Sequence, residues 1–318
     1  MLVAGIDEAG YGPLLGPLVA SGVVFEVPDT LVGADLWEAL TGSICRAPKK
    51  SDSRLAIADS KKLYQRAAGL TALERAALVM LQTAQRKPRT LGGLLKVVAP
   101  ECVSAMLEYP WYVGHDPALP RTTTAADIAT RANAVRRDAR ACGVRLVGVH
   151  SEVLCEGHFN RHLKLTRNKA SVAMGLVLRL VQRILKSHPG GLHLFIDRQG
   201  GREYYVEKLM TFFEGATLRV LEETNLRSAY ELTIGRRTLT MEFLVGGEDH
   251  HLPIALASVY SKYLRELLME GLNQYFKERV EDLLPTAGYH TDAQRFLADI
   301  ESAVASERLD RGLLVRAR

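Results

Sequence analysis

Two adjacent carboxylates stand near the start of the chain, where an apolar run ends. Asp7 and Glu8 follow the apolar residues 2–6, and residues 5–17 contain four glycines and two prolines. Carboxylates at the end of an apolar strand are unfavourable unless their charge is compensated, and a divalent cation is the simplest compensation. The glycines and prolines predict tight turns and the close approach of another backbone or a ligand.

This segment resembles the opening signature of the ribonuclease HII family, Gly-Ile-Asp-Glu-Ala-Gly-Arg-Gly-Pro followed by a second Gly-Pro. Only Tyr11 departs from that pattern, because it stands where the family has a basic residue. The resemblance implies that Asp7 and Glu8 are metal ligands. It also implies that backbone groups of Gly10, Tyr11 and Gly12 contact the 2′-hydroxyl that distinguishes RNA from DNA.

A second block, Asp-Ser-Lys-Lys-Leu at residues 59–63, follows in the family's order. Lys61 and Lys62 at a helix start can hold phosphate. A solvated first turn capped by Asp59 or Ser60 explains the residues equally well. The first block favours proximity to phosphate.

The third block is a helix followed by a buried strand that ends in an aspartate. Residues 168–186 carry a wide apolar stripe that predicts an amphipathic helix, and the apolar residues 192–196 predict a buried strand that ends at Asp197. The family has Asp-Gly here, whereas Arg198 follows Asp197. The alternative is a capping or salt-bridged aspartate.

The fourth block is the segment 254–266, which is similar to the family's helix Ser-Ala-Ala-Ala-Ser-Ile-x-Ala-Lys-Val-x-Arg-Asp. By this resemblance Glu248 holds the position of the last acidic ligand, with Asp249 as the alternative register and a solvated turn as the alternative role. Ser258 and Lys262 share a helix face. They either face the substrate backbone or, for Lys262, pair with a glutamate four residues on.

A final block, Gly-Tyr-x-Thr, begins at residue 288. The resemblance implies that Tyr289 packs its ring against the sugar beside the cleavage junction. A half-buried turn tyrosine is the alternative. The tail, residues 307–318, is rich in arginine and predicts a frayed basic end.

The fold class implied by the resemblance is α/β, with a ribonuclease H-like mixed sheet flanked by helices, inserted segments and a small C-terminal helical part. We expect a catalytic domain over residues 1–270, with insertions at about 89–149 and 203–237, and the helical part over 271–318. Strands are predicted at 2–6, 18–25, 192–196, 217–223, 228–234 and 238–245, and helices at 71–85, 127–142 and 168–186. The arginines of the 127–142 helix favour a solvated face over a phosphate path.

Composition narrows the function classes. The chain has 318 residues with 47% apolar and 24% charged residues, and its formal net charge of +5 mildly favours a polyanionic partner. Its four cysteines are scattered without a Cys-x-x-Cys pair, which favours reduced thiols over a zinc site. Apolar runs fall short of the ~20 residues of a membrane helix. We therefore expect a soluble, cytoplasmic monomer without membrane contact.

Together the acidic positions Asp7, Glu8, Asp197 and Glu248 predict a site for two Mg²⁺ or Mn²⁺ ions. The resemblance implies an endonuclease that hydrolyses the RNA strand of RNA–DNA hybrids, or cuts ribonucleotide-containing duplex DNA, to 5′-phosphate and 3′-hydroxyl ends. One alternative is a divergent nuclease of the same fold acting on DNA. Another is a non-catalytic nucleic-acid-binding relative.

Overall fold

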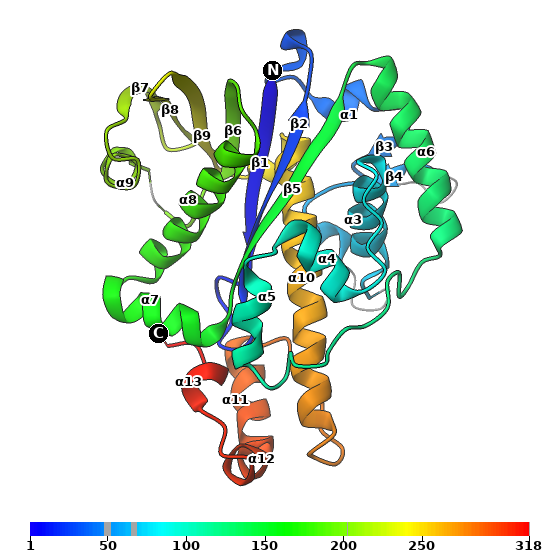
Figure 1. Cartoon of the computed structure of the whole chain (residues 1–318), viewed down its shortest axis with the longest axis vertical. Coiled ribbons are helices and arrows are strands. Elements are labelled where there is room, and N and C mark those ends of the chain that lie inside the picture. The colour runs from blue at the N-terminus through cyan, green and yellow to red at the C-terminus, as the bar shows by residue number, and fades with distance from the viewer. Residues whose placement is uncertain (48–51, 65–68, 202, 318) are drawn as a thin grey trace.

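The computed structural model describes residues 1–318 apart from 48–51, 65–68, 202 and 318. Its centre is a seven-stranded mixed sheet with the order β5-β2-β1-β6-β9-β8-β7 (Figure 1). The strands are β1 (Leu2–Ala9), β2 (Leu18–Glu26), β5 (Arg145–Leu154), β6 (Leu192–Asp197), β7 (Thr217–Glu223), β8 (Arg227–Ile234) and β9 (Arg237–Leu244). β6 runs parallel to both β1 and β9, whereas the other pairs are antiparallel. The carboxyl ends of β1, β6 and β9 therefore meet at one end of the sheet.

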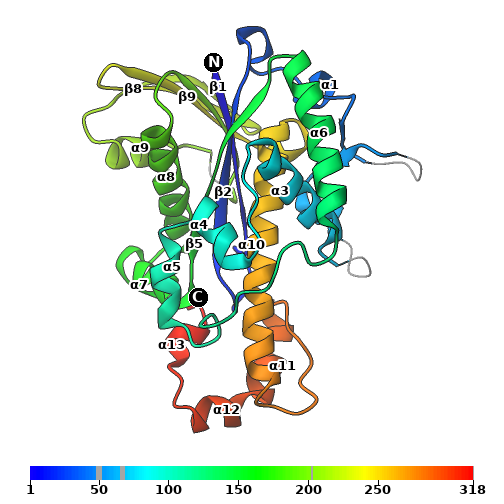
Figure 2. The ribbon, with the colours of Figure 1, turned by 45° about the vertical axis from the view of Figure 1, so that its right-hand side comes forward.

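Helices cover both faces of this sheet (Figures 1 and 2). One face carries α3 (Thr71–Thr83), α4 (Leu91–Val98), α6 (Ala125–Ala141) and α10 (Leu252–Lys277), and the other carries α7 (Glu156–Thr166), α8 (Lys169–Ser187) and α9 (Val206–Phe212). The short helices are α1 (Leu36–Ala39), α2 (Ser60–Leu63), α5 (Cys102–Ala105), α11 (His290–Asp299), α12 (Glu301–Ser306) and α13 (Arg311–Leu314). A pair of two-residue strands, β3 (Ile44–Cys45) and β4 (Leu55–Ala56), lies apart from the main sheet. The predicted α/β class, a mixed sheet flanked by helices, is confirmed.

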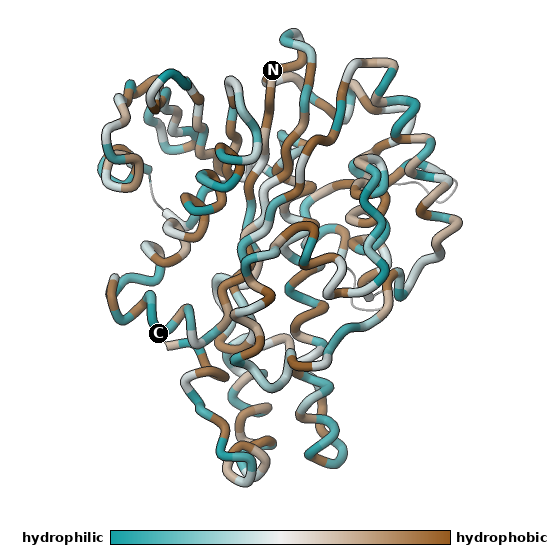
Figure 3. Tube along the Cα trace, viewed as in Figure 1, coloured by the Kyte–Doolittle hydropathy of each residue, from teal (hydrophilic) through white to brown (hydrophobic). Residues whose placement is uncertain are grey.

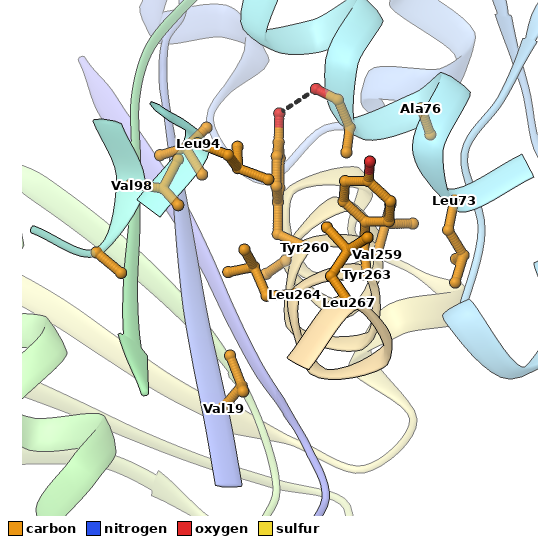
Figure 4. Close-up of a cluster of buried hydrophobic side chains, with 14 of the residues drawn as sticks. Val19, Leu73, Ala76, Leu94, Val98, Val259, Tyr260, Tyr263, Leu264 and Leu267 are labelled. Carbon is orange, nitrogen blue, oxygen red and sulfur yellow. Dashed lines mark hydrogen bonds between the residues drawn. The ribbon is translucent and has the colours of Figure 1, made fainter. Parts of the chain in front are cut away.

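The long helix α10 is held by apolar packing on nearly every side. Figure 3 shows hydrophobic residues along the central strands and hydrophilic ones along much of α6. In Figure 4, Tyr260 and Leu264 of α10 lie among side chains of α3, α4 and β2, and the Tyr260 hydroxyl donates to the Ala77 carbonyl at 2.7 Å. Burial of each such side chain contributes about 1.5–3 kcal/mol. This packing fixes α10 against the sheet.

Gly5 sets how closely α10 approaches β1. A Cβ atom at this position would lie 2.1 Å from the carbonyl carbon of Pro253, at the start of α10. A larger residue would therefore push the helix away from the strand. The close approach also lets the Ser261 hydroxyl donate to the backbone oxygen of Asp7 at 2.9 Å.

Two segments differ from what the sequence predicts. No strand was expected at residues 145–154, where β5 forms the outermost strand beside β2. The prediction of a frayed tail is wrong within its described part, because α13 forms and Arg316 is only 2% exposed. The Arg316 backbone N–H donates to the Leu14 carbonyl at 2.9 Å, and its guanidinium lies 5.1 Å from the Phe159 ring centroid. The last predicted tail residue, 318, lies outside the described residues.

Membrane-spanning helices and cysteine pairing were also considered from the sequence. In the described part of the chain, no helix is long and apolar enough to cross a membrane. The four cysteines, Cys45, Cys102, Cys142 and Cys155, are free thiols.

Candidate active site

Three neighbouring parallel strands, β1, β6 and β9, bring the acidic side chains to one end of the sheet. Ile6 of β1 pairs with Ile196 of β6, so Asp7 and Asp197 follow on adjacent parallel strands, which are ~4.8 Å apart. Glu248 lies in a short 3-10 helix, Gly247–Asp249, that follows β9 and precedes α10. The backbone N–H of Gly247 donates to Asp197 Oδ1 at 3.1 Å, which ties this turn to the end of β6.

Asp7 is buried, and Glu8, Asp197 and Glu248 are half-buried beside it. Burial and the charge of Glu8 raise the pKa of Asp7 to about 8. Burial, the charge of Asp7 and a hydrogen bond with Glu248 raise the pKa of Asp197 to about 9. Burial, with a smaller contribution from the charge of Glu248, raises the pKa of Glu8. Carboxylates that crowd together in this way cannot all ionise without a compensating cation.

Lys61 is a cation of the chain that lies near this cluster. Although burial lowers the pKa of the Lys61 ammonium, the charges of Asp59, Asp7, Glu248 and Asp197 raise it above its ordinary value. In the described part of the chain, none of Asp7, Glu8, Asp197 and Glu248 forms an ion pair with a lysine, arginine or histidine. When ionised, the four carboxylates carry more charge than the two nearby ammonium groups of Lys61 and Lys62.

The donor set fits a hard divalent cation. Glu248 Oε2 is buried without a hydrogen-bond partner, and carboxylate oxygens are the ligands that Mg²⁺ and Mn²⁺ prefer. No group of three or more His, Cys, Asp or Glu side chains among the described residues is already placed to hold a metal ion. The carboxylates must therefore rotate toward a shared ion to bind it.

Glu248 and Asp249, the two candidates for the fourth carboxylate, lie in different surroundings. Asp249 forms an ion pair with Lys62, and both side chains are half exposed. Glu248, in contrast, lies close enough to Asp197 to raise the pKa of that carboxyl. This geometry favours Glu248 as the fourth carboxylate and shows Lys62 engaged at the rim of the site.

Ser258 and Lys262, the two substrate-binding candidates on α10, also differ in whether they contact the carboxylate cluster. The Ser258 side chain is buried, and its hydroxyl donates to Ser60 Oγ at 2.9 Å and to Asp59 Oδ1 at 3.4 Å. Its proximity to Asp7 counteracts part of the rise in the pKa of that carboxyl. Lys262 pairs with Glu266 at 2.7 Å, and its ammonium lies 4.8 Å from the ring centroid of Tyr64. The structure thus brings Ser258 into contact with the cluster and directs Lys262 to an intrahelical partner.

The glycine-rich loop lies against the Gly-Tyr block. Gly288 has a φ of 83°, and its carbonyl accepts from the Leu14 N–H at 2.7 Å. Tyr289 is 54% exposed, and its ring edge comes within 4.0 Å of a Cβ atom built on Gly12. An exposed aromatic ring thus stands over the loop whose backbone is expected to contact the substrate.

Gly10 packs closely inside this loop. It has a φ of 90°, and a Cβ atom there would lie 2.6 Å from Arg265 Nε and from the Pro17 carbonyl. Only glycine combines this backbone conformation with this approach.

Two residues at the site carry no signal in the sequence. Lys169, at the start of α8, places its ammonium 5.1 Å from the ring centroid of Tyr11, so a cation stands beside the residue that replaces the family's basic side chain. Gln199 donates to Glu8 Oε2 at 3.0 Å. Arg198, by contrast, turns away and donates to Ser228 Oγ at 2.9 Å. Long separation along the chain hides these neighbours from sequence inspection.

The sequence matches no protein-family model and no curated protein. Among solved structures, the chain is similar to the RNase HII of Archaeoglobus fulgidus in its PCNA complex, with 15% identity, coverage of 100% of this chain and 95% of that chain, and a TM-score of 0.42. It is also similar to ribonuclease H2 from Pyrococcus horikoshii OT3, with 13% identity, coverage of 99% and 92%, and a TM-score of 0.43.

A third similar structure is Bst-RNase HIII in complex with Mn²⁺, with 13% identity, coverage of 99% of this chain and 66% of that chain, and a TM-score of 0.40.

Proposed function

We propose that this protein is a metal-dependent endonuclease of the ribonuclease H type. Its substrates would be RNA–DNA hybrids or duplex DNA that contains ribonucleotides. The observation that supports this most directly is the convergence of Asp7, Glu8, Asp197 and Glu248 at one end of the sheet, where burial and the neighbouring carboxylates raise the pKa values of Asp7, Glu8 and Asp197. A buried cluster of this kind is costly to the fold, and a site for divalent ions explains its presence.

Asp7, Glu8, Asp197 and Glu248 would hold Mg²⁺ or Mn²⁺, two ions in the proposed complete site. When bound, the ions supply Lewis acidity and charge neutralisation for phosphodiester hydrolysis, which leaves 5′-phosphate and 3′-hydroxyl ends. The protein contributes carboxylates at the ends of β1 and β6 and in the turn before α10, which rotate toward the ions to bind them. It also contributes Gln199, whose hydrogen bond holds one oxygen of Glu8.

The chain's own cations suit the path of a phosphate backbone past this site. Lys61 lies beside the carboxylates, and Lys169 lies beside Tyr11 at the glycine-rich loop. Phosphate contacts position a nucleic acid but do not read the sugar. In this proposal Lys61 and Lys169 orient the strand, with Lys62 at the rim.

Discrimination of ribose from deoxyribose must use the 2′-hydroxyl. The backbone of Gly10, Tyr11 and Gly12 is the proposed partner of that hydroxyl. The exposed ring of Tyr289, which stands over Gly12, is the proposed contact of the adjacent deoxyribose. Ser258 would act through Asp7 by holding its carboxylate.

The test is a cleavage assay on a duplex with one ribonucleotide and on a matched all-DNA duplex, each with Mg²⁺ and with Mn²⁺. We expect cleavage of the ribonucleotide-containing duplex alone, reduced at least about 100-fold in Asp7→Asn. Cleavage of both duplexes would favour a divergent DNA nuclease. Binding without metal-dependent cleavage would instead identify a non-catalytic relative.

A further inference from the structure

A groove runs along the free edge of the sheet, away from the carboxylate cluster. β5 is the outermost strand, and in the described part of the chain it pairs with β2 alone. Residues 143–150 line one side of a cavity of about 690 Å³, and the end of α3 and one side of α6 line the other. The groove reaches Glu26 of β2, whereas Asp7 lies opposite Ser21. These positions are roughly 15 Å apart along the strand.

The groove has an apolar floor and a basic rim. Its apolar lining includes Phe25, Leu40, Met80, Leu81, Val135 and Val149. Arg86, Arg136 and Arg140 line the opposite wall, and Arg86 and Arg140 are exposed. Within the described residues, neither of these two forms an ion pair.

The remaining charges of the groove do not offset this basic rim. Glu26 is the acidic side chain in the lining, and Arg145 already pairs with it. Arg136 donates to the Gln82 carbonyl at 2.9 Å, and its Nε atom is buried without a partner. The local field in the groove is therefore positive and favours a negatively charged occupant.

The strand edge adds a second requirement, which is an extended backbone. In an antiparallel pair, alternate residues direct both their N–H and C=O groups away from the partner strand. Those of β5 face the groove, and an added strand can pair with them. A bulge between Val24 and Phe25 breaks the regular β2–β5 pairing, and bulges limit indiscriminate edge pairing. Side chains in the groove must therefore contribute to the choice of partner.

We propose that this groove binds an extended segment of a partner protein that adds a strand to β5. Apolar side chains of that segment occupy the floor, and its acidic side chains meet Arg86, Arg136 and Arg140. Because the floor and the arginines both lie on the face of the sheet that carries α3 and α6, the apolar and acidic side chains that contact them stand at every second position of the added strand. This proposal is independent of the nuclease proposal, because the groove shares no residue with the carboxylate cluster.

The experiment selects binders from a displayed library of random twelve-residue peptides on the full-length protein and measures the enriched peptides by fluorescence anisotropy. We expect enriched sequences in which apolar and acidic residues occupy every second position, on one face of the strand. Arg140→Glu should weaken their binding at least about tenfold, because it reverses one rim charge. Methylation of alternate backbone nitrogens of the peptide should abolish binding in one of the two registers.

The matched control is Arg137→Glu. Arg137 lies on the same helix and is also exposed, but it does not line the groove. We expect it to leave affinity within about twofold, since exposed charges outside a contact contribute little. The absence of enriched peptides, or equal losses in Arg137→Glu and Arg140→Glu, would overturn the proposal.

Discussion

Replacement of Asp197 by asparagine should stabilise the metal-free protein while removing its response to metal. Asp197 has a pKa of about 9, against an ordinary value of 3.8. At pH 7 the Asp197 carboxyl is ionised in the unfolded chain and protonated in the folded chain, so folding requires the uptake of a proton. Asparagine is neutral in both states and avoids this cost.

The size of the effect follows from the distance between the ordinary pKa and the working pH. Neutral pH lies about three pH units above 3.8, and each is worth about 1.4 kcal/mol. The gain in the free energy of unfolding from Asp197→Asn is therefore at most about 4 kcal/mol. The actual gain will be smaller because Asp7, with a pKa of about 8, retains part of the same repulsion. Asparagine keeps the acceptor for the Gly247 N–H, and its amide can donate to Glu248.

The dependence on pH has a definite sign. A raised carboxyl pKa means that the folded state binds more protons than the unfolded state between about pH 4 and pH 9. This contribution to stability is fully present below the ordinary pKa of 3.8 and is lost as pH rises through the folded-state value of about 9. The wild-type free energy of unfolding should thus fall more steeply with pH than that of Asp197→Asn.

The assay is thermal and urea unfolding in EDTA-treated buffer from pH 5 to pH 8, with and without Mn²⁺. For a chain of this size, each kcal/mol corresponds to about 2–4 °C in Tm. Mn²⁺ should raise the Tm of the wild type by preferential binding to the folded state and should have little effect on Asp197→Asn. A lower Tm in metal-free Asp197→Asn, or an unchanged Mn²⁺ response, would refute the reasoning.

Two further predictions concern the fourth carboxylate and the C-terminal tail. Glu248→Gln should reduce cleavage by on the order of 100-fold, whereas Asp249→Asn, which loses only an exposed pair with Lys62, should retain activity within about threefold. The reverse ranking in single-turnover assays would exchange the two roles. Arg316→Ala should lower the free energy of unfolding by about 1–3 kcal/mol, because it leaves the buried Pro13 carbonyl without its guanidinium donor. Urea unfolding measures this, and an unchanged midpoint would contradict it.

The features that the sequence determined by itself are those written in local order. The amphipathic helix predicted at 168–186 forms as α8, Lys169–Ser187, and the buried strand predicted at 192–196 forms as β6, Leu192–Asp197. Periodicity of apolar residues encodes both, because each element must bury one side against the core. The acidic residues Asp7, Glu8, Asp197 and Glu248 were likewise recognisable from their types and their order along the chain.

β5 was missed because its pattern is locally ambiguous. Gly148 and His150 interrupt its apolar residues, and a bulge shifts its register against β2. Its strand conformation depends on pairing with β2, more than a hundred residues away in sequence. The packing of the C-terminal residues was missed for a related reason. An arginine near a chain end predicts a solvated charge, and only the tertiary structure shows that Arg316 contacts Phe159 and the Pro13 carbonyl.

The tertiary structure also decided which of several equivalent side chains face the cluster. Lys61 and Lys62 are adjacent in sequence, yet the first lies near the carboxylates and the second pairs with Asp249. Lys169 reaches Tyr11 across a long interval of chain. Residue type and spacing limit what a side chain can do, but its electrostatic partners depend on distances through space. Those distances exist only once β1, β6 and α10 have packed together.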